Sequence, residues 1–248
     1  MSDPLAALLR LDGVYEAVDA ARASIDTLLK ERVLVRRRGE VTAESIRRGS
    51  WASARLDGAE LTLDDYYPPF GEDADDRLAA AALRTTAQVG SLATVWASAP
   101  LQALARLHTL AAADEVDADG LGRPRTDLEV SARLAQLAEV VTSPTQAPAV
   151  VVAAVVHGEV MALQPFAWGN GIVARAAQRL VLVQRGVDPD ALSVPEEGLL
   201  RAGEATYREA VAGYAAGTAD GVTRWLMLVA SSVARGAAIG REVCHSLD

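Results

Sequence analysis

The most constraining feature of this sequence is the spacing of its apolar residues, which recur every three or four positions along almost the whole chain. This spacing places them on one face of a helix. Aromatic residues make up only 4% of the chain, and no Asn-Gly or Asp-Gly turn lies between cleanly alternating segments, so the signals of β-hairpins are missing. We therefore predict an all-α protein.

Proline and glycine clusters divide this pattern into segments. The expected helices span residues 14–36, 42–56, 74–98, 100–112, 127–142, 147–163, 171–186, 196–216 and 219–241. We find no internal repeat and no linker long enough to require two independent domains. The prediction is an N-terminal helical arm over residues 1–70 on a helical core over residues 71–248.

Composition narrows the classes of partner. Hydrophobic residues make up 50% of the chain and charged residues 23%, which is typical of a globular protein. The 33 acidic residues outnumber the 24 basic ones, for a net charge of -9. Such a surface repels phosphates, so we expect neither a nucleic-acid partner nor an anionic membrane surface.

The expected location is the cytoplasm. The chain has a single cysteine, Cys244, which cannot form an internal disulfide and fits a reducing compartment. The start, Met1-Ser-Asp-Pro-Leu, lacks the features of a secretory signal. The longest apolar run, Ala147 to Val156, is shorter than the roughly 18 residues that span a bilayer.

One loop carries a candidate binding site. Gly169, Asn170 and Gly171 form a turn that opens an apolar helix, and Arg175 lies on the first turn of that helix. Free backbone N–H groups at a helix start form a small anion site, and an arginine can add a bidentate contact to a phosphate. The alternative is a plain tight turn in which Asn170 caps the helix.

The segment Leu163-Gln-Pro-Phe-Ala-Trp-Gly-Asn-Gly-Ile-Val-Ala-Arg175 resembles the signature of the Fic family, His-Pro-Phe-x-(Asp/Glu)-Gly-Asn-Gly-Arg-x-x-Arg. This resemblance implies a helical Fic-like core over roughly residues 75–240. It also implies a family activity, the transfer of AMP or another phosphate-containing group from a nucleotide to a protein hydroxyl.

Three departures from the signature argue against that activity. Gln164 replaces the family's general base, and an amide cannot accept a proton near neutral pH. Trp168 replaces the acidic Mg²⁺ ligand, and Ile172 replaces the first signature arginine, so only Arg175 of the two remains. His157 is no substitute base, because seven helical residues separate it from Gln164 by about 10 Å; we interpret it as a packed core histidine.

A fourth departure lies upstream of the signature. The family usually has a β-hairpin flap there that aligns the target segment by strand addition. Here the chain passes from Gly120 to Arg125 almost directly into the helix expected at 127–142, which leaves little length for a hairpin.

The arm carries a second resemblance. Ser53-Ala-Arg-Leu-Asp57-Gly58 resembles the Fic inhibitory motif (Ser/Thr)-x-x-x-Glu-(Gly/Asn), with Asp57 in place of the glutamate that pairs with the second signature arginine. We therefore expect Asp57 within about 4 Å of Arg175. The alternative is that Gly58 simply ends a helix and Asp57 is solvated.

These features favour a degenerate Fic-like protein that lacks AMP-transferase activity and acts in binding or regulation. The expected partners are a protein and, with weak affinity, ATP, another nucleotide or phosphate. No resident cofactor and no metal site are expected, because the histidines and the cysteine lack ligand spacing. One alternative is an active Fic-type nucleotidyl or phosphoryl-group transferase that modifies protein hydroxyls. Another is a structural interaction module with Trp168 filling the pocket.

Overall fold

The structure, a computed structural model, describes residue 3 and residues 5–248. Met1, Ser2 and Pro4, part of the segment tested for a secretory signal, lie outside the described residues. The described chain folds into η1 (Ala6–Arg10), α1 (Val14–Leu28), α2 (Leu34–Leu56), α3 (Ala74–Ala87), α4 (Val89–Ser98), α5 (Pro100–Ala111), α6 (Leu128–Thr142), α7 (Ala149–Leu163), α8 (Asn170–Gln184), α9 (Pro195–Ala202), α10 (Glu204–Ala215) and α11 (Ala219–Ser246). These residues contain no strand, which confirms the all-α prediction. None of the described helices has the length and apolar character needed to cross a membrane.

Three expected helices are divided in the structure. The helix predicted at 14–36 is wrong, because α1 ends at Leu28 and α2 begins at Leu34. No proline or glycine marks this break; the chain turns there so that Leu28, Val33 and Leu34 can all be buried. The segment 74–98 breaks at Gln88, and 196–216 breaks at Gly203, whose φ of 100° lies in the region that favours glycine.

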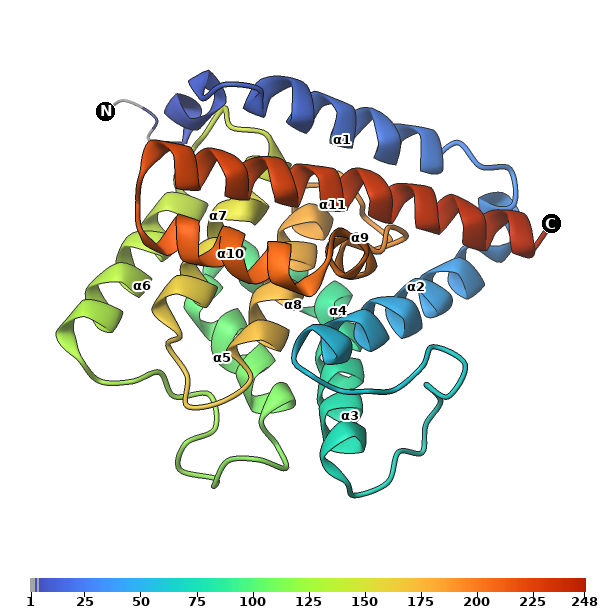
Figure 1. Ribbon diagram of the computed structural model, residues 1–248, viewed down its shortest axis with the longest axis horizontal. Helices are drawn as coiled ribbons and strands as arrows, with labels where there is room; N and C mark the ends of the chain where they lie inside the picture. Colours follow the sequence, from blue (N-terminus) through green and yellow to red (C-terminus); the bar gives the residue numbers. More distant parts are fainter. Residues whose placement is uncertain (1–2, 4) are drawn as a thin grey trace.

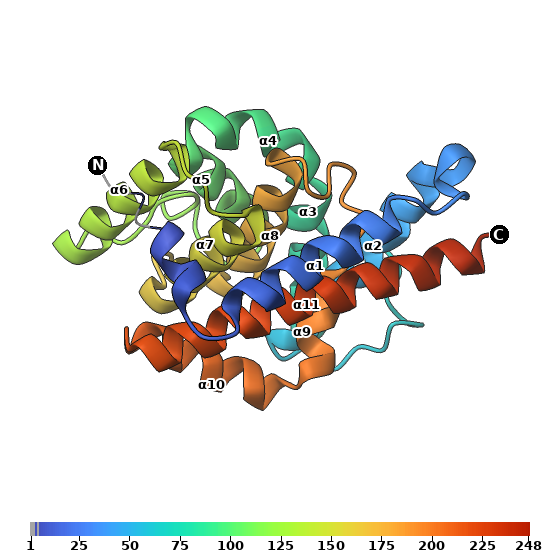
Figure 2. The ribbon, with the colours of Figure 1, turned by 90° about the horizontal axis from the view of Figure 1, so that it is seen from above.

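Helices α7 and α8 lie in the middle of the fold, with α4, α5, α10 and α11 around them (Figures 1 and 2). α7 is buried along most of its length, because its residues are apolar on every side. α1 and α11 run in parallel along one side of this core (Figures 1 and 2). Their direction is fixed by Gly13 next to Met227 at one end and Leu28 next to Gly240 at the other.

Helix α2 is mostly polar, yet it packs closely on the core through small residues spaced four apart. Ser45, Gly49 and Ser53 are buried on this face. A Cβ on Gly49 would lie 2.5 Å from Arg179 Nη2 and 2.9 Å from Glu196 Oε2, so a larger residue would displace both. α2 therefore approaches α8 closely because this face has almost no side-chain bulk.

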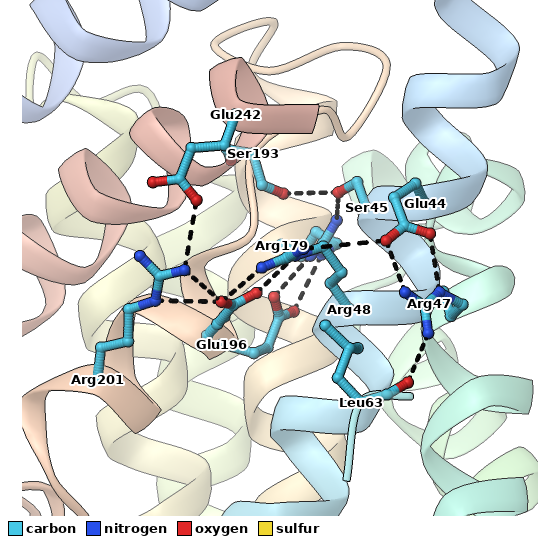
Figure 3. A network of polar contacts seen from close by, with 11 residues as sticks. Glu44, Ser45, Arg47, Arg48, Leu63, Arg179, Ser193, Glu196, Arg201 and Glu242 are labelled. Atoms are coloured by element: carbon cyan, nitrogen blue, oxygen red, sulfur yellow. Dashed lines mark hydrogen bonds and ion pairs between the residues drawn. The ribbon is translucent and has the colours of Figure 1, made fainter. Parts of the chain in front are cut away.

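A buried ion pair lies at this interface (Figure 3). Arg179 of α8 and Glu196 of α9 are joined by two contacts, Nη2–Oε2 at 2.6 Å and Nε–Oε1 at 2.9 Å. Their side chains are only 1% and 3% exposed. Arg179 Nη1 also donates to Ser45 Oγ, 2.9 Å away on α2. The pair thus joins α2, α8 and α9 at one point.

We predict that Glu196→Gln lowers the free energy of unfolding by about 3 kcal/mol, because the substitution removes the carboxylate that is directly bonded to the buried Arg179 charge. Urea unfolding measures this effect. Glu204→Gln is the matched control, since Glu204 lies 3.8 Å from Arg208 on an exposed helix face, and it should leave stability nearly unchanged. Equal effects of the two substitutions would contradict the role assigned to the buried pair.

Candidate functional site

The signature loop connects α7 to α8 and is closed by one side chain. Asn170 Oδ1 accepts from the backbone N–H of Phe166 at 2.9 Å, and Asn170 Nδ2 donates to the Phe166 carbonyl at 2.8 Å. The alternative in which Asn170 caps the helix is wrong. The N-cap is Gly169, at a φ of 70° and with no side-chain cap, because the Asn170 amide is already used to hold the loop.

The end of α2 positions Asp57. Gly58, at a φ of 107°, donates its N–H to the Arg55 carbonyl, and the Ala59 N–H returns to the Ala54 carbonyl, both at 3.0 Å. This pair of bonds is a Schellman motif, which ends the helix through a left-handed glycine. Asp57 is therefore the last residue before the chain turns away, and Gly58 has the helix-ending role considered from the sequence.

Asp57 and Arg175 form the expected ion pair. Asp57 Oδ1 lies 2.8 Å from Arg175 Nη2, with the arginine side chain 1% exposed and the carboxylate 22% exposed. Burial opposes the charge of Arg175, but Asp57 and Tyr207 together outweigh this effect and raise the pKa of the guanidinium. The alternative of a solvated Asp57 is wrong at this position.

The same carboxylate lies over the start of α8. A Cβ added to Gly171 would overlap both oxygens of Asp57 and lie 3.0 Å from Arg175 Nη1. The first N–H groups of a helix have no partner within it and attract negative charge. Asp57 therefore lies where the Gly169-Asn170-Gly171 turn was expected to receive an anion. Trp168 does not take this place; it is half-buried and packs against the hydrophobic core.

Arg175 has further partners on two helices. Its Nε donates to Ser53 Oγ at 2.9 Å, and its Nη2 donates to the Ser53 carbonyl at 3.0 Å. Its Nη1 donates to the hydroxyl of Tyr207 on α10 at 3.4 Å. Ser53 and Asp57 of the inhibitory-motif-like segment thus both meet the signature arginine.

Tyr207 leads from Arg175 to a buried histidine. The Tyr207 hydroxyl lies 2.8 Å from His157 Nε2, and His157 Nδ1 lies 2.5 Å from Gln178 Oε1. Burial lowers the pKa of His157 to about 3 and raises the pKa of Tyr207 to about 12. Both groups are therefore neutral at physiological pH, and His157 is a core histidine as interpreted from the sequence.

The substituted signature positions have different surroundings. Gln164 ends α7 in a left-handed conformation, at a φ of 44°, and is exposed. Ile172 is only 1% exposed and belongs to the hydrophobic core. Neither residue supplies a basic nitrogen or a charge to the start of α8.

The segment before α6 packs onto the signature loop without forming a hairpin. The Arg125 N–H donates to the Pro165 carbonyl at 2.7 Å, and its guanidinium donates to the carbonyls of Leu163 and Gln164 at 2.9 and 3.1 Å. Residues 120–127 contain no strand, as their short length led us to expect.

His108 of α5 supports the same loop from the other side. Its ring stacks on Phe166, with centroids 4.2 Å apart and planes within 6°. Its Nδ1 accepts from the Gly122 N–H at 2.9 Å. Burial lowers the pKa of His108, so this acceptor role is compatible with its neutral form.

The described residues bring together no group of three His, Cys, Asp or Glu side chains that could hold a metal ion. The polar groups that converge on the start of α8 are Asp57 and Arg175, an arrangement suited to an anion that replaces the carboxylate. We did not identify the contacts of Arg179, Tyr207 or His108 from the sequence. The sequence did contain one indication that Arg179 lies close to Arg175: the two arginines are four residues apart in an apolar helix and therefore share a face.

The buried state of His157 predicts a dependence of stability on pH. Its pKa in the folded protein, about 3, is below the ordinary value of 6.5, so the unfolded chain binds this proton first and stability falls as pH falls below 6.5. Relative to His157→Gln, the wild type should lose about 2 kcal/mol of unfolding free energy between pH 7 and 5. Urea unfolding at both pH values checks this, and a pH-independent difference between the two proteins would contradict it.

Comparison with known proteins supports the fold. No protein-family model matches the chain, and no curated protein matches it. Among solved structures, a Fic family protein from Desulfovibrio desulfuricans superposes with a TM-score of 0.73 at 21% identity, covering 92% of this chain and 75% of that one. Fic-1 from C. elegans gives 0.71 at 14% identity, covering 95% and 74%.

A third solved structure is similar to this chain over nearly the whole of its own length. A Fic domain containing signaling protein from Bacteroides thetaiotaomicron gives a TM-score of 0.62 at 14% identity, covering 93% of this chain and 98% of that one. This chain has the fold of the Fic family proteins.

Proposed function

We propose that this chain is a degenerate Fic-family protein that does not transfer AMP and acts as a binding or regulatory protein. The observation that carries this proposal is the position of Asp57, paired with Arg175 over the first turn of α8. A nucleotide phosphate that used this helix start would have to displace the carboxylate. Its remaining attraction would come from one arginine and the backbone N–H groups.

The chemistry at the other signature positions supports the same proposal. General base catalysis needs a group that can take a proton from the target hydroxyl, and Gln164 has none. Transfer of a phosphate-containing group also needs positive charge around the phosphates, which Ile172 and Trp168 do not supply. Catalytic groups of this kind act together, so one remaining group does not restore the rate of transfer when the others are lost.

The competing proposal is an active transferase that Asp57 inhibits. It is favoured by the geometry of the Asp57–Arg175 pair, which matches what the inhibitory-motif resemblance leads one to expect. The two proposals differ in what happens when the carboxylate is removed. An inhibited enzyme gains activity, whereas a protein without a base and a metal ligand does not.

We therefore predict that neither the wild type nor Asp57→Ala transfers label from α-³²P-ATP to proteins of a bacterial lysate, with or without Mg²⁺. Gel autoradiography measures the incorporation. Label that appears with Asp57→Ala and disappears with Asp57→Ala/Arg175→Ala would establish the active transferase instead. Asp64→Ala, in the exposed loop after α2, controls for the loss of a carboxylate.

We further propose that the start of α8 binds phosphate or a nucleotide weakly, without a resident cofactor. Asp57→Ala should bind inorganic phosphate, ADP or ATP with a dissociation constant near millimolar, equivalent to about 4 kcal/mol, and the wild type should bind more weakly because Asp57 competes. Amide chemical shifts of Gly169 and Gly171 follow the titration. No shift in Asp57→Ala at tens of millimolar phosphate would mean that the turn is structural only.

A protein partner is the remaining part of the proposal. A Fic-like core without transfer chemistry still presents the loop 120–127 and the turn at 164–169 on adjoining segments, joined through Arg125 and Pro165. Affinity capture with wild type and Arg125→Ala, followed by size-exclusion chromatography of the purified pair, tests this role. A partner that survives purification and is lost with Arg125→Ala supports it, and capture unaffected by Arg125→Ala contradicts a role for this surface.

A further inference from the structure

The partners of Arg175 come from two different parts of the fold. Three of its contacts are to α2, to Ser53 Oγ, to the Ser53 carbonyl and to Asp57, at 2.9, 3.0 and 2.8 Å. The fourth is the Tyr207 hydroxyl on α10, at 3.4 Å. An anion that displaces Asp57 disturbs the end of α2, but it need not disturb α10. Tyr207 is therefore the contact through which the core itself can hold the guanidinium.

The hydrogen-bond chain behind Tyr207 has a defined direction. Gln178 Oε1 can only accept, so the proton of neutral His157 lies on Nδ1, and His157 Nε2 is left as an acceptor. The Tyr207 hydroxyl must then donate to Nε2 across 2.8 Å. Its oxygen lone pairs are thereby free to accept from Arg175 Nη1.

Burial keeps this direction from reversing. His157 is 0% exposed and Tyr207 is 3% exposed, and their rings lie in contact with Trp225 of α11. The Trp225 indole N–H is bonded to the Ala154 carbonyl at 2.8 Å, so it does not compete for His157. A reversed chain would place the Tyr207 hydroxyl between two donors, His157 Nε2–H and Arg175 Nη1–H, and leave its own proton without an acceptor, which is costly in a buried site.

We propose that Tyr207 is a positioning residue for Arg175, and that the chain Gln178–His157–Tyr207 holds the guanidinium at the start of α8 whether or not Asp57 is paired with it. This inference rests on the proposed anion site and adds to it the residues that keep its one cation in place. His157 acts at a distance from the anion, through the direction that it imposes on the Tyr207 hydroxyl.

The first test compares phosphate binding in the background in which the site is open. Asp57→Ala/Tyr207→Phe should bind inorganic phosphate about 5- to 10-fold more weakly than Asp57→Ala, the effect of losing one hydrogen bond of ordinary strength, because the Arg175–Tyr207 contact is long at 3.4 Å. Asp57→Ala/Tyr214→Phe is the matched control. Tyr214 lies on the same helix, packs on Trp225 and donates its hydroxyl to Glu159 at 2.9 Å. The Tyr214→Phe substitution should change the affinity for phosphate less than twofold. Equal losses of affinity from the two tyrosine substitutions would overturn the proposal.

The second test does not depend on phosphate. In ¹⁵N NMR spectra of Asp57→Ala, His157 should carry its proton on Nδ1, and the Arg175 Nη1–H group that donates to Tyr207 should exchange slowly with water. Tyr207→Phe should accelerate this exchange, and Tyr214→Phe should not. A proton on His157 Nε2, or exchange unchanged by Tyr207→Phe, would overturn the proposal. If Asp57→Ala binds no phosphate but these spectra are as expected, the anion site fails while the positioning role stands.

Discussion

The structure depends on the neutralisation of two arginines that helix α8 places inside the protein. Arg175 and Arg179 lie one turn apart, and each is only 1% exposed. A buried guanidinium is costly unless its charge is paired and its N–H groups are bonded. Asp57 supplies the carboxylate for one and Glu196 for the other, from segments on opposite sides of α8 in the sequence. This requirement ties α2 and α9 to α8.

The shape of α2 follows from the same requirement. Ser45 and Ser53 each give an oxygen to one arginine, and Gly49 between them leaves room for the Arg179–Glu196 pair. A helix with larger residues on this face could not approach α8 closely enough. The contacts of Asp57 are therefore part of the packing of α2 as well as of the candidate site, and an anion that reaches Arg175 must compete with both.

The helical class and most helix positions could be predicted from apolar spacing, because burial of one face is a local property of the sequence. The predicted pairing of Asp57 with Arg175 came from the two resemblances and was confirmed by the structure. The break after Leu28 could not be predicted, because residues 28–34 contain no proline or glycine and the chain turns where Leu28, Val33 and Leu34 become buried. The sequence left open that Asn170 caps the helix, which is wrong, because its partner, the Phe166 backbone, becomes available only when the loop closes.

The sequence by itself determined the all-α class, the loop that opens α8 and the absence of a basic side chain at Gln164. Only the tertiary structure decided which groups other than Asp57 meet Arg175. Ser53 and Tyr207 are distant from it along the chain, by 122 and 32 residues. Neither their distance nor the direction of the hydrogen bonds behind Tyr207 is encoded in any local pattern. These contacts form because the buried charge of Arg175 needs polar partners, and the packing of the helices decides which polar groups lie beside it.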